Sequence, residues 1–279
     1  MKNTLKNLNI INKVEEDNEI IIEVELEIYN DEVDKEINIL CDENKLSKDN
    51  KDIENDIKEN NLNIIPPKEF NYFNKGNTKL YLNDKEIEFN YKLKLNNKGI
   101  YKILIKSNVK LFSLSTIFYN CLNINKINFI KINTNNVADM SCMFSNCYNL
   151  SKLELSSFNT KNVTNMMEMF ADCYNLSELD LSSFNTINVT NMFAMFSGCY
   201  NLSKLDLSSF IIKNVTNMMG MFSSCSKISD LDLSSFEINS DTHIRGMFGN
   251  FLLNQILINK INIKKIKEKN VIDIEIFKI

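Results

Sequence analysis

Charged and hydroxyl side chains recur at matching places in the second half of the chain, where they could bind a basic peptide or a cation. Glu154, Asp180, Asp206 and Asp232 are 26 residues apart, and a serine follows each of them by two residues. Parallel strands would set these carboxylates about 5 Å apart in one line. The predicted partner-binding face consists of Lys152, Glu154, Ser156, Glu178, Asp180, Ser182, Lys204, Asp206, Ser208, Asp230, Asp232 and Ser234.

The same acidic line also has a purely structural interpretation. Like charges at this spacing repel by about 1 kcal/mol per pair in water. Lys152 and Lys204 lie close enough in the pattern to offset part of that repulsion. On this interpretation the carboxylates are only the consensus of a repeat and the face is solvated. From the sequence, both interpretations stay open.

The elements that must position these side chains belong to a repeat of 26 residues. Its most regular column is aromatic, and cysteine and methionine columns keep the same step. The aromatic column consists of Phe118, Phe144, Phe170, Phe196, Phe222 and Phe248. A fixed period of this size predicts a solenoid, in which each unit buries its apolar face against its neighbours. Methionines beside phenylalanines predict packing, so no metal and no cofactor is expected.

One repeat unit contains two patterns in succession. Met166, Met169, Phe170 and Cys173 follow the spacing i, i+3, i+4, i+7, which predicts a short helix. The segment 176–184 then has the order L-x-x-L-x-L-x-x-F, typical of the strand half of a leucine-rich repeat. The fold class expected is therefore α+β, a leucine-rich repeat solenoid with parallel strands and short helices, preceded by a small β domain.

The consensus of these units resembles the BspA-type leucine-rich repeat family of bacterial and protist surface proteins. The matching text is Met-Phe-x-x-Cys-x-x-Leu-x-x-Leu-Asp-Leu-Ser-Ser-Phe-Asn-Thr-x-Asn-Val-Thr-Asn-Met, which begins at Met169 and recurs nearly verbatim from Met195. The resemblance covers about residues 118–250 and implies a curved solenoid used for adhesion or protein binding. It also implies that the outward strand positions line a concave face, and it supplies no catalytic residues.

The flanks of the repeats differ from them in pattern. Residues 1–107 are predicted to form a β-rich domain, possibly immunoglobulin-like, residues 108–255 the solenoid, and residues 256–279 capping strands. Alternation over 20–28 predicts a half-buried strand. Residues 80–91 predict one hairpin around Asn83-Asp84, and residues 93–105 predict a second around the turn at 96–99. Residues 43–62 are charged and predict a loop or weak helix.

Composition argues against several functional classes. His243 is the only histidine, and no phosphate-binding glycine loop or nucleophile motif occurs, so the chain is predicted not to be an enzyme. A net charge of −4 and a single arginine, Arg245, argue against nucleic-acid binding. Seven cysteines without a CxxC pair fit buried thiols in a reducing compartment.

Targeting signals are also missing from the sequence as written. Its N-terminus does not resemble a signal peptide, and no stretch is long enough to span a bilayer. We therefore expect no membrane insertion and a cytoplasmic location, with the cell surface as the alternative that the resemblance implies. The function expected is a non-catalytic module that binds a protein partner. The alternatives are a surface or adhesion protein whose leader or anchor is absent here, and a cation-binding acidic ladder.

Overall fold

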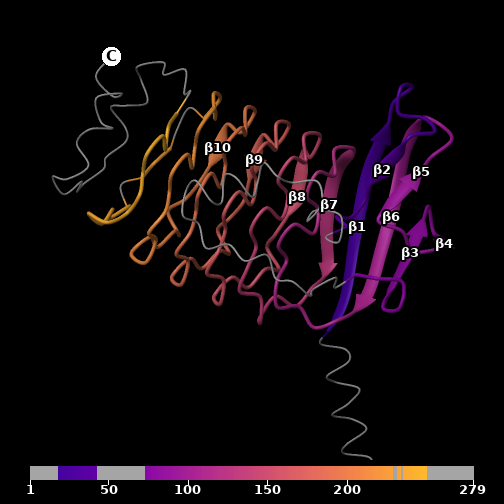
Figure 1. Ribbon diagram of the computed structural model, residues 1–279, viewed down its shortest axis with the longest axis horizontal. Helices are drawn as coiled ribbons and strands as arrows, with labels where there is room; N and C mark the ends of the chain where they lie inside the picture. The colour runs from indigo at the N-terminus through magenta and orange to yellow at the C-terminus, as the bar shows by residue number, and fades with distance from the viewer. Residues whose placement is uncertain (1–17, 43–72, 229–230, 234, 250–279) are drawn as a thin grey trace, which may run out of the picture.

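A computed structural model describes residues 18–42, 73–228, 231–233 and 235–249. The described residues form strands, turns and loops, and they contain no helix. Figure 1 shows the strands of the N-terminal part at one end and the repeats following one another along the long axis. The strands are β1 (Glu19–Ile28), β2 (Glu36–Asn38), β3 (Thr78–Leu82), β4 (Lys85–Ile87), β5 (Lys92–Lys94), β6 (Gly99–Asn108), β7 (Ile124–Lys131), β8 (Lys152–Glu154), β9 (Glu178–Leu179) and β10 (Lys204–Leu205).

The sheet with the most strands joins the N-terminal part to the first repeats. Its strand order is β4-β3-β6-β1-β7-β8, and β1 pairs antiparallel with both β6 and β7. The alternation predicted for 20–28 is confirmed, because Ile20, Ile22, Val24, Leu26 and Ile28 are all buried in β1. The sheet thus crosses the predicted boundary between residues 107 and 108, which stays a prediction.

One of the two predicted hairpins is present. Strands β3 and β4 pair antiparallel across Asn83 and Asp84, both of which have positive φ (46° and 67°), as a tight hairpin turn requires. The second hairpin is wrong, because β5 pairs with β2, whereas β6 pairs with β3 and β1. An immunoglobulin-like sandwich is also not what these strands form, because β4, β3, β6 and β1 continue directly into the repeats.

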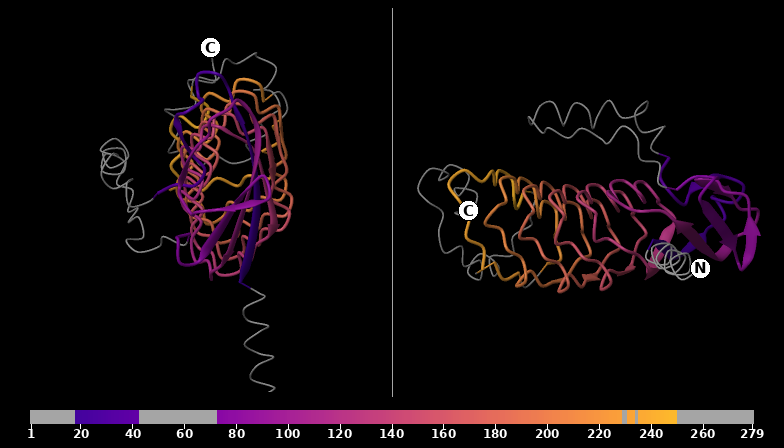
Figure 2. Two further views of the ribbon diagram at one scale, coloured as in Figure 1. Left: turned by 90° about the vertical axis from the view of Figure 1, so that its right-hand side faces the viewer. Right: turned by 90° about the horizontal axis from the view of Figure 1, so that it is seen from below.

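The repeats stack with equivalent side chains in contact. The rings of Phe118, Phe144, Phe170, Phe196, Phe222 and Phe248 form one column with centroids 5.6–5.9 Å apart and interplanar angles of 4–15°. The first five of these rings are fully buried, and each aromatic pair contributes about 0.5–1.5 kcal/mol beyond its buried area. Seen end-on in Figure 2, successive coils lie one behind another.

The predicted α+β class is wrong, because turns occupy the place of the short helices. In the unit around Phe170, the residues Glu168 and Asp172 have positive φ (51° and 57°), which an α-helix does not allow. Alternate N–H groups bond the next repeat, Glu168 to Phe193 O at 2.8 Å and Phe170 to Met195 O at 3.0 Å. The apolar spacing of a helix therefore arises here from successive turns.

The predicted leucine-rich repeat solenoid with parallel strands and short helices is not supported either. Parallel pairing is limited to short stretches, since β8 has three residues and β9 and β10 have two each. Isolated bridges and turn hydrogen bonds connect the described repeats elsewhere. Residues 256–279, 43–62, Asp230 and Ser234 lie outside the described residues, so the predictions made for them are not addressed by the structure.

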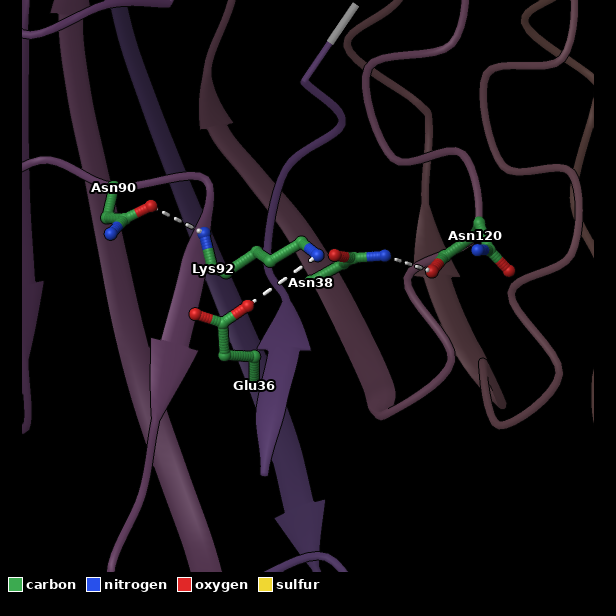
Figure 3. A network of polar contacts seen from close by, with 5 residues as sticks. All are labelled: Glu36, Asn38, Asn90, Lys92 and Asn120. Atoms are coloured by element: carbon green, nitrogen blue, oxygen red, sulfur yellow. Dashed lines mark hydrogen bonds and ion pairs between the residues drawn. The ribbon is translucent and has the colours of Figure 1, made fainter. Parts of the chain in front are cut away.

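The N-terminal part closes the first coil through polar contacts. The Cys41 N–H donates to Ile117 O at 2.9 Å, and the Asn38 side chain donates to Asn120 O at 3.0 Å. Figure 3 shows Asn38 beside the ion pair between Lys92 and Glu36, with 3.8 Å between Nζ and Oε2. Strand β2 is thereby tied both to β5 and to the first repeat.

Candidate partner-binding face

Strands β8, β9 and β10 position the predicted face. Lys204 pairs with Glu178 and Leu205 with Leu179, so equivalent residues of these two repeats lie side by side. The side chains of Leu179 and Leu205 are buried, so the alternating partners point outward. The predicted residues that the structure describes are all exposed: Lys152, Glu154, Ser156, Glu178, Asp180, Ser182, Lys204, Asp206, Ser208 and Asp232.

Each carboxylate that precedes a described serine closes a local turn. The N–H of Ser182 donates to Asp180 Oδ1 at 2.9 Å, and the N–H of Ser208 donates to Asp206 Oδ1 at 2.8 Å. Glu154 accepts the equivalent bond from Ser156 at 3.0 Å. Each of these serines is thus exposed on the face and also donates a hydrogen bond to the acid that precedes it.

These bonds stabilise the ionised form of the acids. The Ser182 hydroxyl and N–H lower the pKa of Asp180, and the Ser208 N–H and hydroxyl lower the pKa of Asp206. Charge repulsion acts against this, because Asp180 and Asp232 each raise the pKa of Asp206 to a smaller extent. Asp180 and Asp206 are therefore ionised at neutral pH, while neighbouring carboxylates stand close enough to repel one another.

Basic residues on the same face offset little of that charge. Lys204 Nζ lies 3.9 Å from Glu178 Oε2, but both side chains are strongly exposed, and such pairs contribute about 0–1 kcal/mol. Lys152 faces Lys126 in the register of β7 and β8, a like-charge pair. We call the set Glu154, Asp180, Asp206 and Asp232 the acidic row.

The face extends into the N-terminal sheet, which sequence reasoning did not predict. Glu23 of β1 is paired with Asn128 of β7, and Asn128 is paired with Glu154 of β8. On its other side Glu23 is paired with Leu104 of β6. The alternation of glutamate with isoleucine in β1 was visible in the sequence, but the register that aligns Glu23 with the acidic row was not.

Other chemically capable groups have structural positions. His243 ends a ladder of isolated bridges that runs from Ser113 through one residue per repeat. The column cysteines are buried, and burial raises the pKa of the Cys147 thiol to about 12. The Cys147 S–H group also donates a hydrogen bond to Phe118 O at 3.0 Å. Among the described residues, no group of three or more His, Cys, Asp or Glu could hold a metal ion.

A search of the described part of the chain for membrane-spanning helices found none that is long and apolar enough.

Comparison with protein families gives a match over the repeats. The family model described as "Mycoplasma protein of unknown function, DUF285" matches residues 112–230 and 176–274, which together cover more than half of the chain. The chain belongs to the DUF285 family. The assignment to a BspA-type leucine-rich repeat family is therefore corrected, and the function of the DUF285 family is unknown. No curated protein and no solved structure matches the chain.

Proposed function

We propose that this DUF285 chain is a non-catalytic module that binds a basic protein partner through the face containing the acidic row. The observation that carries the proposal is the combination of exposure and fixed position. Asp180 and Asp206 are exposed and ionised, yet each is held by the serine that follows it. Charges that are already ordered lose less conformational entropy when a partner binds.

The line of charge suits a partner with several cations. The carboxylates follow the strand spacing of about 4.8 Å, close to the 5–6 Å that separates neighbouring side chains on one face of a helix. A lysine-rich or arginine-rich helix could place several cations along the row. An extended strand presents same-face side chains about 6.8 Å apart and would lose register within a few residues.

A cation-binding role for the acidic row has less support. A calcium ion takes six to eight oxygen ligands, whereas neighbouring repeats offer it two carboxylates that already accept hydrogen bonds from serine. Thermal unfolding in the presence of millimolar Ca²⁺ tests this alternative, and a raised midpoint that is lost in Asp180→Asn would support it.

Charge reversal tests the proposal. Proteins that co-purify with the wild-type chain from its native cells should be lost when Asp180→Lys and Asp206→Lys are combined. The control combines Asp31→Lys and Glu237→Lys, which produce the same change in net charge at exposed positions outside the row. Equal recovery with both double variants would refute a role for the acidic row.

The compartment of this module is open to a direct measurement. The cytoplasmic location expected from the sequence and the cell-surface alternative differ in whether an externally added protease reaches the chain in intact cells. The adhesion role was implied by the BspA-type resemblance, so it no longer has that basis. Cleavage at the surface of intact cells would restore it as a candidate.

A further inference from the structure

The line of the acidic row continues across the N-terminal sheet and ends on apolar side chains. Glu23 of β1 is paired with Leu104 of β6, and Leu104 is paired with Tyr81 of β3. Leu104 is half-buried between two fully buried neighbours, Ile103 and Ile105, so its side chain points to the opposite, outer face of the sheet. Figure 1 shows β6 and β3 beyond β1, on the side away from the repeats, so the line has an apolar end there.

Three side chains form this apolar end. Ile21 lies one outward position from Glu23 along β1, diagonally across from Leu104, and is half-buried like Leu104 and Tyr81. Diagonal neighbours on one face of an antiparallel pair stand roughly 7–8 Å apart, within reach of long side chains. We call Ile21, Tyr81 and Leu104 the apolar patch. Each of the three keeps part of its surface in contact with solvent, which a partner can cover.

Lysines beside the apolar patch distinguish it from the acidic row. Lys79 is paired with Lys106 in the register of β3 and β6, and Lys106 Nζ lies 5.2 Å from the centre of the Tyr81 ring. Lys79 also forms an exposed ion pair with Glu86, with 3.5 Å between Nζ and Oε1. Two lysines against one glutamate leave this end of the face positive. It therefore repels the cations that the acidic row attracts.

We propose that the partner of this face is a lysine-rich or arginine-rich helix with an uncharged apolar residue near one end, and that this residue contacts the apolar patch. The inference rests on the proposed function, because the acidic row has to bind the basic part of the helix. A row of equal carboxylates does not by itself fix where a run of cations lies along it. An apolar contact at one end, beside lysines that exclude cations, fixes both the position and the direction of the helix.

Strand spacing sets the length of that helix. The line runs from Leu104 to Glu154 in three steps of about 4.8 Å, and three repeats then lead to Asp232. Six steps amount to about 29 Å, which a helix rising about 1.5 Å per residue covers in about 19 residues. With its apolar residue on Leu104, the helix would set a cation about ten residues later opposite Glu154.

Two designed peptides that differ at one residue test the inference on the full chain. Each is a helix of about 20 residues with lysines along one face. One has a leucine at the end of that face, and the other has a serine there. Isothermal titration calorimetry at low ionic strength measures both dissociation constants. We expect the wild-type chain to bind the leucine peptide about tenfold more tightly, because the leucine is removed from water on binding.

Strand β6 supplies a matched pair of variants. Leu104→Thr removes most of the apolar contact and should bring the ratio of the two dissociation constants close to one. Ile100 lies four residues away on the same face of the same strand and is 63% exposed, so Ile100→Thr should keep the tenfold ratio. Threonine suits a β-strand at both positions, and circular dichroism checks that both variants are folded.

The possible outcomes separate this inference from the proposed function. If the wild-type chain binds both peptides equally while Asp180→Lys with Asp206→Lys weakens both, the apolar contact is overturned and the acidic row keeps its role. If neither peptide binds, or if the double variant binds both as the wild type does, the proposed function fails and the inference fails with it. A tenfold ratio that survives Leu104→Thr as fully as Ile100→Thr would place the leucine elsewhere and overturn the inference alone.

Discussion

The buried threonine column provides a quantitative test of how the repeats hold together. Thr186 is fully buried, and its hydroxyl donates to Ile211 O at 3.1 Å and accepts from Ile211 N–H at 2.7 Å. Thr186→Val keeps the shape of the side chain and removes both bonds. At about 0.5–1.5 kcal/mol per hydrogen bond, the free energy of unfolding should fall by about 1–3 kcal/mol.

Two matched variants isolate the cause of that loss. Thr186→Ser retains the hydroxyl and should recover most of the stability. Thr190 is exposed and its hydroxyl donates one hydrogen bond, to Thr164 O at 3.2 Å, so Thr190→Val should cost less than about 1 kcal/mol. Urea unfolding followed by far-ultraviolet circular dichroism measures all three. If Thr186→Val unfolds at the wild-type midpoint with an unchanged slope, the hydroxyl bonds do not stabilise the stack.

Three further predictions concern charge, thiols and backbone strain. Because the pKa values of Asp180 and Asp206 are lowered in the folded chain, their contribution to stability is present above their unfolded pKa and is lost as pH falls through the folded value. Urea unfolding should therefore show stability declining below about pH 4, and less steeply in Asp180→Asn. Among the cysteines, half-buried Cys41 should react rapidly with a thiol reagent and the six buried ones only on unfolding, which mass spectrometry of the labelled chain resolves. Gly198 has φ of +72° and a side chain there would overlap the Asp172 carboxylate, so Gly198→Ala should destabilise the chain by about 1 kcal/mol or more, and less in an Asp172→Ala background.

The columns of the repeat could be predicted from the sequence because their spacing is exact. Five phenylalanines at a constant step are sufficient to predict one aromatic stack, and the rings of Phe118 through Phe222 lie at 5.7–5.9 Å from one another. Exposure of the acidic row also follows from alternation with buried leucines. Both inferences depend only on the side-chain period of a strand and on stacking in register.

The backbone between the columns could not be predicted in the same way. A spacing of i, i+3, i+4, i+7 places Met166, Met169, Phe170 and Cys173 on one side of a helix, and it does the same in successive turns. A helix and these turns differ in φ at Glu168 and Asp172, which is positive here. Neither residue type indicates a left-handed conformation as strongly as a glycine would. At the same two positions of later repeats the chain does carry Gly220 and Gly198, a signal that points to turns.

The register between β1 and β7 explains why the N-terminal part and the repeats present one continuous face. Buried Ile22 and Val24 alternate with Glu23 and Glu25 along β1, so a slip of one residue would turn the glutamates into the core. Burying an unpaired carboxylate costs several kcal/mol, which makes that slip prohibitive. The same alternation that builds the core therefore fixes Glu23 in line with Glu154. A partner that contacts the acidic row should then lose affinity on Glu23→Lys, although Glu23 lies outside the repeats.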